Sequence, residues 1–173
     1  MSSLNKAKYK NAILYFLEHI NNSHLGKVKL MKLLYYMDFD HFEKCGTSIT
    51  GDEYKNYPAG PVPEGGDAIL KEMQAEGLID ISKEQVIDYL KYKYTPKARH
   101  EPSAFLPSEV EILSSVAEKW EHHSTNEIIA ASHGEAPWLA TENGETIPYA
   151  LAYYRGKYDE PLTEVEEEGE VVC

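Results

Sequence analysis

Residues 27–44 read KVKLMKLLYYMDFDHFEK, and the spacing of the apolar side chains in this stretch decides the fold class. Apolar residues recur at helical spacing, on one main stripe and on stripes beside it. The main stripe holds Leu30, Leu33, Leu34 and Met37, and the adjoining ones hold Val28, Met31, Tyr35, Phe39 and Phe42. A helix that is apolar over so much of its surface has neighbours on several sides. We expect this helix to be central and to end at Gly46, because glycine readily adopts the left-handed conformation that closes many helices.

The flanking segments predict two more helices and a β-hairpin. Apolar spacing predicts an amphipathic helix over residues 4–20, before the central one, and a short helix over residues 64–76, after it. Residues 78–81 and 86–94 are rich in β-branched and aromatic side chains, which predicts a hairpin with its turn at residues 82–85. A helix followed by such a hairpin is typical of a winged-helix-like unit.

A loop and a longer helix follow from glycine, proline and capping patterns. Residues 47–66 hold many glycines and prolines, so we expect a shaped loop there. Ser108 is expected to cap a helix, with Glu109 in the first turn where the helix dipole favours acidic residues. The inward face of this helix is predicted to hold Val110, Leu113, Ala117 and Trp120.

Two short helices complete the prediction. Ser124 or Thr125 is expected to cap a helix that ends at Gly134, and Pro148 suits the first turn of a last helix through Tyr154. The fold class expected is therefore mainly α, a compact helical domain with a small antiparallel, winged-helix-like β-hairpin.

Length and composition place the chain among globular proteins. It has 173 residues, of which 42% are hydrophobic and 27% charged, and no apolar run is long enough to span a membrane. We expect one folded domain over residues 1–158, a disordered acidic tail over residues 159–173, and a cytoplasmic location. Cys45 and Cys173 stand far apart in the sequence, so we expect neither a disulfide nor a cysteine metal site.

The net charge of −12 is distributed unevenly. Residues 1–100 hold fourteen basic and thirteen acidic residues, whereas residues 101–173 hold three and sixteen. An acidic half repels nucleic acid and attracts a basic protein partner over long range. We therefore do not expect the whole surface to bind nucleic acid.

Few patterns in the sequence indicate catalysis. Asp38 and His41 lie three residues apart on one helical face and could form an acid–base pair, which leaves a small hydrolase as one hypothesis. No third metal ligand accompanies them, and the loop at residues 60–66 lacks the spacing of a nucleotide-binding motif. We expect no catalytic residue, no metal and no cofactor.

Basic and aromatic residues alternate near the predicted hairpin. Lysines and an arginine are interleaved there with tyrosines, a pattern that can contact phosphates and stack on bases. The basic residues are Lys91, Lys93, Lys97 and Arg99. They leave open an alternative function, that of a winged-helix-like DNA-binding regulator of its own operon.

Three ordered motifs resemble a known family. The first is KLMKLLYYMD at residues 29–38, the second is ITGD at residues 49–52 leading to YPAGPV at residues 57–62, and the third is SHGEAPW at residues 132–138. Together they resemble the Panacea domain of SocA-like antitoxins over roughly residues 8–155. Tyr57 stands where that family often has a tryptophan, and Ser132 replaces its usual threonine.

The resemblance implies a non-enzymatic protein that binds and neutralises a toxin encoded beside it. Related members deliver the bound toxin to a cytoplasmic protease, so such a protease is a second partner that the resemblance implies. We expect the toxin to contact the central helix, the G-P-V loop and the P-W segment. The residues predicted for this surface are Tyr35, Asp38, Tyr57, Gly60, Pro61, Val62, His133 and Trp138.

Overall fold

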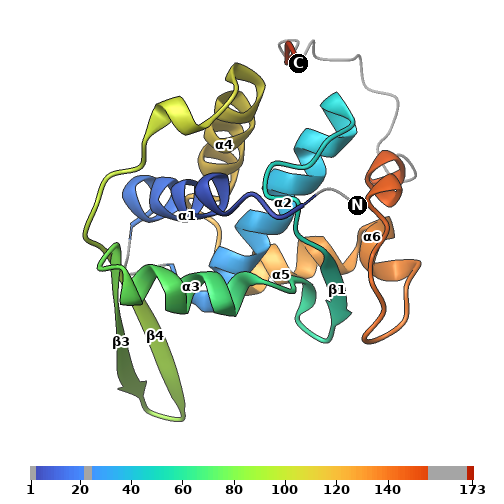
Figure 1. Ribbon diagram of the computed structural model, residues 1–173. Helices are drawn as coiled ribbons and strands as arrows, with labels where there is room; N and C mark the ends of the chain where they lie inside the picture. The colour runs from blue at the N-terminus through green and yellow to red at the C-terminus, as the bar shows by residue number, and fades with distance from the viewer. Residues whose placement is uncertain (1–2, 22–24, 156–170) are drawn as a thin grey trace.

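The computed structural model describes residues 3–21, 25–155 and 171–173 (Figure 1). In this part of the chain the protein is mainly helical, as the sequence predicts for its class, and it has two antiparallel two-stranded sheets where one hairpin is predicted. The helices are α1 (Lys6–His19), α2 (Lys27–Cys45), α3 (Gly66–Ala75), α4 (Pro107–Trp120), α5 (Thr125–His133) and α6 (Ala136–Leu139), with 3-10 helices η2 (Pro102–Ala104) and η3 (Tyr149–Tyr154). The strands are β1 (Tyr54–Tyr57), β2 (Gly60–Pro63), β3 (Ile79–Val86) and β4 (Tyr89–Pro96).

Helix α2 runs through the centre of the fold. It contacts α1, α4, α5, η3 and strand β2, and its side chains are buried around most of its circumference. Even Lys29 and Lys32 are buried. The helix ends where predicted, because Gly46 adopts the left-handed conformation with φ of 76° and its N–H donates to the carbonyl of Phe42. The prediction of a central helix is confirmed.

Helix α4 begins differently from the prediction. Leu106, not Ser108, is the capping residue, and the carboxylate of Glu109 accepts a hydrogen bond from the backbone N–H of Leu106 (2.7 Å). Pro107 occupies the first helical turn, where a missing N–H costs nothing. Ser108 is buried within the helix, and Val110, predicted inward, is exposed. The inward face is Ile112, Leu113, Val116, Ala117 and Trp120.

The predicted hairpin exists, but its turn was placed wrongly. Strands β3 and β4 pair from Ile79 opposite Pro96 to Val86 opposite Tyr89, so the turn lies at residues 87–88. The polar residues 82–85 belong to strand β3. This part of the hairpin is exposed on both faces, so its side chains do not have to alternate between apolar and polar.

A second hairpin, β1–β2, lies in the segment predicted to be a loop. Tyr54 pairs with Pro63 and Tyr57 with Gly60, so two prolines stand in strand β2. Proline is tolerated on an edge strand, and β2 is the edge here, because β1 bonds on its other side to residues 145–147.

The end of the described chain departs from the prediction in two ways. Residues 149–154 form a 3-10 helix rather than an α-helix, and Cys173 forms a disulfide with Cys45, with a Cα–Cα distance of 5.5 Å. The expectation of two unpaired cysteines was wrong, since 128 positions separate them and spacing alone does not reveal such a pairing. Residues 159–170 of the predicted acidic tail lie outside the described residues. Within the described ranges, no helix is both long and apolar enough to cross a bilayer.

Candidate partner-binding site

The turn of the β1–β2 hairpin stands on a floor formed by α2 and α5. Gly60, the first residue of β2 directly after the turn, has φ of +105°, a conformation that residues other than glycine rarely adopt. A Cβ atom at this position would lie 2.5 Å from Ser132 Oγ and 2.8 Å from Lys32 Cε. Glycine is therefore required here both by the backbone conformation and by the closeness of the floor.

Lys32 holds the hairpin from below. Its Nζ donates a hydrogen bond to the carbonyl of Pro61 (2.7 Å), and the side chain is fully buried. Burial away from water lowers the pKa of Lys32 to about 8, because the charged form loses its hydration. The G-P-V turn is thus bonded directly to the central helix.

Two aromatic residues of the third motif hold the turn from the side. The Nε2–H of His133 donates to the carbonyl of Pro58 (2.8 Å), and the indole N–H of Trp138 donates to the carbonyl of Tyr57 (2.9 Å). The two rings lie 4.2 Å apart. These bonds leave the backbone of the turn little freedom to move.

Asn56 adds a further connection to the same segment. One N–H of its side-chain amide donates to the carbonyl of Trp138 (2.8 Å), and the other is shared between the carbonyl and the hydroxyl of Thr141 (3.0 Å each). The side chain is 4% exposed, so these acceptors replace water. The second and third motifs, about eighty residues apart in sequence, are therefore one structural unit.

A charged cluster supports this unit from behind. Glu135, which precedes α6, accepts a hydrogen bond from the hydroxyl of Tyr36 and lies 3.6 Å from Arg155. Arg155 also pairs with Asp40 (2.7 Å) and Glu43 (2.9 Å) on α2. Burial raises the pKa of Glu135, and the Arg155 guanidinium partly offsets this shift. The cluster joins η3, α2 and the start of α6.

Asp38 fixes the chain that leads into the hairpin. Its carboxylate accepts hydrogen bonds from the N–H groups of Ile49 and Thr50 and from the hydroxyls of Thr50 and Tyr54. Burial raises the pKa of Asp38, while these bonds act in the opposite direction. Asp38 and Tyr35 are both fully buried, so they support the site from inside and offer no surface to a partner.

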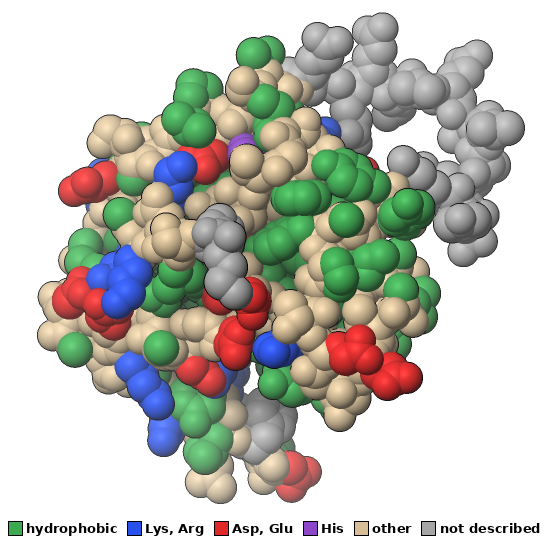
Figure 2. Space-filling view, turned by 45° about the vertical axis from the view of Figure 1, so that its right-hand side comes forward, with side chains coloured by type: hydrophobic (Ala, Val, Ile, Leu, Met, Phe, Trp, Pro, Cys, Tyr) green, Lys and Arg blue, Asp and Glu red, His purple; other side chains and the backbone are tan. Residues whose placement is uncertain are grey.

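The exposed part of the site is apolar. Tyr57 is 43% exposed and Leu139 is 62% exposed, and a hollow of about 320 Å³ lies between the hairpin and α6. We call Tyr57, Pro58, Trp138 and Leu139 the hairpin surface. Figure 2 brings forward the side that carries β1 and α6, and hydrophobic side chains gather on the right of that view. Val62 is half-buried on the same face of the sheet as Tyr57, because it pairs with Lys55.

The structure thus brings together six of the eight predicted partner-binding residues. They are Tyr57, Gly60, Pro61, Val62, His133 and Trp138, although Gly60 and Pro61 are themselves buried in the turn. Sequence reasoning missed Leu139, Asn56 and Lys32 as parts of the site. The only sequence signals were that Lys32 and Leu139 lie in or directly after the recognised motifs.

The acid–base pair that would support a hydrolase is not formed. His41 bonds through Nδ1 to the carbonyl of Thr47 and through Nε2 to the hydroxyl of Ser108 (3.0 Å), whereas the partners of Asp38 lie elsewhere. His41 and Ser108 are 2% and 3% exposed, so a substrate has no access to them. In the part of the chain that the structure describes, no group of three histidine, cysteine or acidic side chains could hold a metal ion.

The basic residues of the alternative function lie on the other hairpin. Lys91 and Lys93 are half-buried on β4, and Lys97 and Arg99 follow it as exposed residues. Lys97 pairs with Asp80 on the neighbouring strand (3.0 Å).

A mainly helical domain is what the resemblance implies, and the structure adds that the second and third motifs meet at the β1–β2 hairpin. The sequence matches the family described as "Antitoxin SocA-like, Panacea domain" over residues 30–139, and the chain belongs to this family. The match runs from the first turn of α2 to the end of α6, so it includes Lys32, the β1–β2 hairpin and Trp138. No curated protein and no solved structure matches the chain.

Proposed function

We propose that this protein is a cytoplasmic antitoxin that binds and neutralises a toxin encoded beside it, without catalysis, through the hairpin surface. The observation that carries the proposal is the exposed apolar area of Tyr57 and Leu139, where three side-chain hydrogen bonds hold the hairpin backbone in place. Membership of the SocA-like antitoxin family supports a protein toxin as the partner.

The physical character of the surface supports protein binding. A turn that is already fixed loses little conformational entropy when a partner binds. Aromatic residues such as Tyr57 and Trp138 carry much of the binding energy at protein interfaces. The acidic second half of the chain, with three basic and sixteen acidic residues, would speed the approach of a basic toxin.

The test is growth rescue combined with a binding measurement. The adjacent reading frame is induced alone and together with this protein, and the dissociation constant of the purified pair is measured. Leu139→Glu places a charge in the proposed interface and should weaken binding by about a hundredfold or more and abolish rescue. Leu106→Glu is the matched control, because Leu106 is a 56% exposed leucine at the start of α4 and should leave binding unchanged. Tight binding by Leu139→Glu would remove the hairpin surface from the interface.

Two modes of neutralisation follow from the family resemblance. Simple sequestration leaves the toxin present but inactive, whereas an adaptor delivers it to a cytoplasmic protease. The half-life of the toxin in cells, measured with and without this protein, separates the two modes. A shortened half-life that Leu139→Glu restores would support the adaptor.

The DNA-binding regulator stays an untested prediction. It requires salt-sensitive binding to DNA that is lost when Lys91, Lys93, Lys97 and Arg99 are replaced. Binding to the operon DNA by the wild-type protein alone would favour this alternative over the antitoxin.

A further inference from the structure

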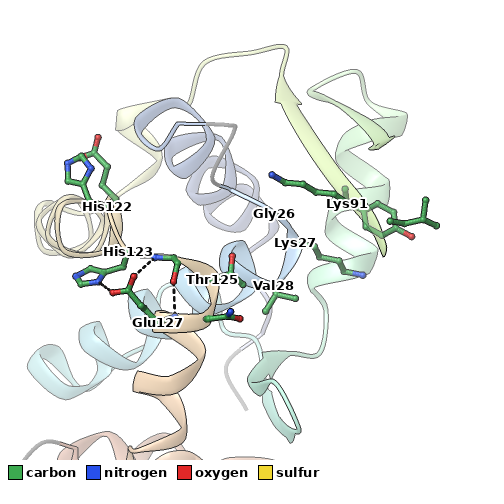
Figure 3. Close-up of a pocket in the computed structure, with 13 residues that line it drawn as sticks. Gly26, Lys27, Val28, Lys91, His122, His123, Thr125 and Glu127 are labelled. Atoms are coloured by element: carbon green, nitrogen blue, oxygen red, sulfur yellow. Dashed lines mark hydrogen bonds and ion pairs between the residues drawn. The ribbon is translucent and has the colours of Figure 1, made fainter. Parts of the chain in front are cut away.

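A second concave surface lies at the opposite end of α5 from the hairpin surface. This groove has a volume of about 970 Å³ and is formed by three segments: the start of α2, strand β4 and the junction between α4 and α5. Figure 3 shows Lys27 and Lys91 on one side of it, and His122, His123 and Glu127 on the other. We call it the wing groove. Its lining includes Lys27, Val28, Leu90, Lys91, Glu121 and Glu127.

The wing groove is preformed. Lys27 pairs with Asp67 at the start of α3 (2.5 Å), and its Nζ also lies 5.8 Å from the centre of the Tyr92 ring on β4. These contacts tie α3 and the middle of β4 to the start of α2. The opposite wall is fixed by Lys29, whose buried Nζ donates to the carbonyl of His123 (2.7 Å).

The two walls carry side chains of opposite charge, with apolar side chains beside them. Lys91 and Lys27, the latter paired with Asp67, lie on one wall, and Glu121 and Glu127 lie on the other, beside His122 and His123. Val28, at the start of α2, is 38% exposed, and Leu90, next to Lys91 on β4, is 55% exposed. A nucleic acid strand would meet Lys91 but would be repelled by the acidic wall. A protein segment can satisfy both walls at once.

We infer that the wing groove binds a segment of the toxin that carries an apolar side chain between an acidic and a basic one. The apolar side chain would contact Leu90 and Val28, the acidic side chain would face Lys27 and Lys91, and the basic side chain would face Glu121 and Glu127. This inference rests on the proposed function. It adds a second contact at the other end of α5, so that one toxin is held at both ends of this helix.

The experiment measures toxin affinity in variants of the full-length protein. Leu90→Glu and Glu121→Lys change an apolar lining residue and the acidic wall, and each should raise the dissociation constant about tenfold or more. The matched controls lie on the same elements outside the groove. Ile87→Glu alters the 94% exposed tip of the same hairpin, and Glu118→Lys alters an exposed position of α4, so both should change the affinity less than about twofold. Unchanged melting temperatures would establish that all four variants are folded.

The outcomes separate this inference from the proposed function. If Leu139→Glu weakens toxin binding while Leu90→Glu and Glu121→Lys bind as tightly as the wild type, the wing groove is not a toxin contact and the proposed function stands. If the wild-type protein does not bind the toxin, both fail. Self-association in the absence of toxin that Leu90→Glu abolishes would overturn the inference in favour of a second copy of the chain. Salt-sensitive DNA binding that Lys91→Glu abolishes would overturn it in favour of nucleic acid.

Discussion

The two hairpins of this protein are held in place by different means. Hairpin β1–β2 has four-residue strands and is bonded to the rest of the fold through Lys32, Asn56, His133 and Trp138. Hairpin β3–β4 has eight-residue strands, buries Ile79 and Tyr94 near its base, and exposes its tip. An isolated two-stranded hairpin is marginally stable in water, so the short one depends on these tertiary bonds and the long one on the packing of its base against the core. This difference explains why the recognised motifs lie around the short hairpin.

The largest loss of stability should come from adding a single methyl group to the short hairpin at Gly60. Gly60→Ala combines an unfavourable φ of +105° with overlap of the new Cβ with Ser132 and Lys32. We expect a loss of about 3–4 kcal/mol in the free energy of unfolding, measured by urea denaturation.

Gly77→Ala is the control for Gly60→Ala at the entry to the long hairpin. Gly77 also has a positive φ, of 76°, but no atom lies within 4 Å of its Cβ position. Only the backbone strain of about 1 kcal/mol should appear there. Equal losses of unfolding free energy in the two variants would show that Ser132 and Lys32 move away from the new Cβ of Gly60→Ala without destabilising the fold.

Asn56→Ala should cause the next largest loss of unfolding free energy. It removes two N–H donors that bind Trp138 and Thr141 from a residue that is 4% exposed, which should cost about 2–3 kcal/mol of stability and free the α6 segment. Gln85→Ala changes an exposed amide in the long hairpin and should lie within about 0.5 kcal/mol of the wild type. Hydrogen exchange of the residues 138–141 provides the local readout, and unchanged protection there in Asn56→Ala would contradict the role assigned to this side chain.

The pH dependence of stability should also distinguish the two hairpins. The pKa of Lys32 falls from 10.5 to about 8 on folding, so between these values the unfolded chain binds more protons than the folded one. Stability therefore rises with pH in this window, by about 2 kcal/mol between pH 7 and pH 9.5.

Lys32→Met provides the test of this pH dependence. The variant should lose the rise, measured as the difference between urea denaturation curves at the two pH values. Lys97→Met, on the long hairpin, removes an exposed lysine and should keep the wild-type rise. A rise that persists in Lys32→Met would assign it to another group.

The contrast between elements fixed by a local pattern and elements fixed by tertiary bonds also decides what could be predicted from the sequence. Apolar spacing gave the central helix and its end at Gly46, because tertiary contacts there only reinforce a local pattern. The long hairpin was found but its turn was misplaced, since exposed polar strand residues resemble a turn. The short hairpin was missed altogether, because its prolines favour a loop and its bonds come from residues distant in sequence.

The candidate site shows the same limit. Tyr57, His133 and Trp138 were found through their motifs, and the structure brings them together. Tyr35 and Asp38 were predicted from the first motif, but a motif does not tell which side chains of a largely buried helix reach the surface, and both are buried. The Cys45–Cys173 disulfide depends on the tertiary fold, and no local pattern marks it, while the position of Leu139 directly after the third motif does not show that its side chain is exposed.

The smallest effect should come from the tip of the long hairpin. Ile87 and Asp88 form a two-residue turn, and neither has a positive φ. Two-residue hairpin turns favour positive φ at both positions, as in Asn-Gly, because this geometry matches the twist of the strands. Replacing the pair by Asn-Gly should therefore increase hydrogen-exchange protection in β3 and β4. The free energy of global unfolding should change by less than about 0.5 kcal/mol, because the tip contacts nothing in the core. A large change in global stability would mean that the exposed ribbon is coupled to the core, and the contrast between the two hairpins would then fail.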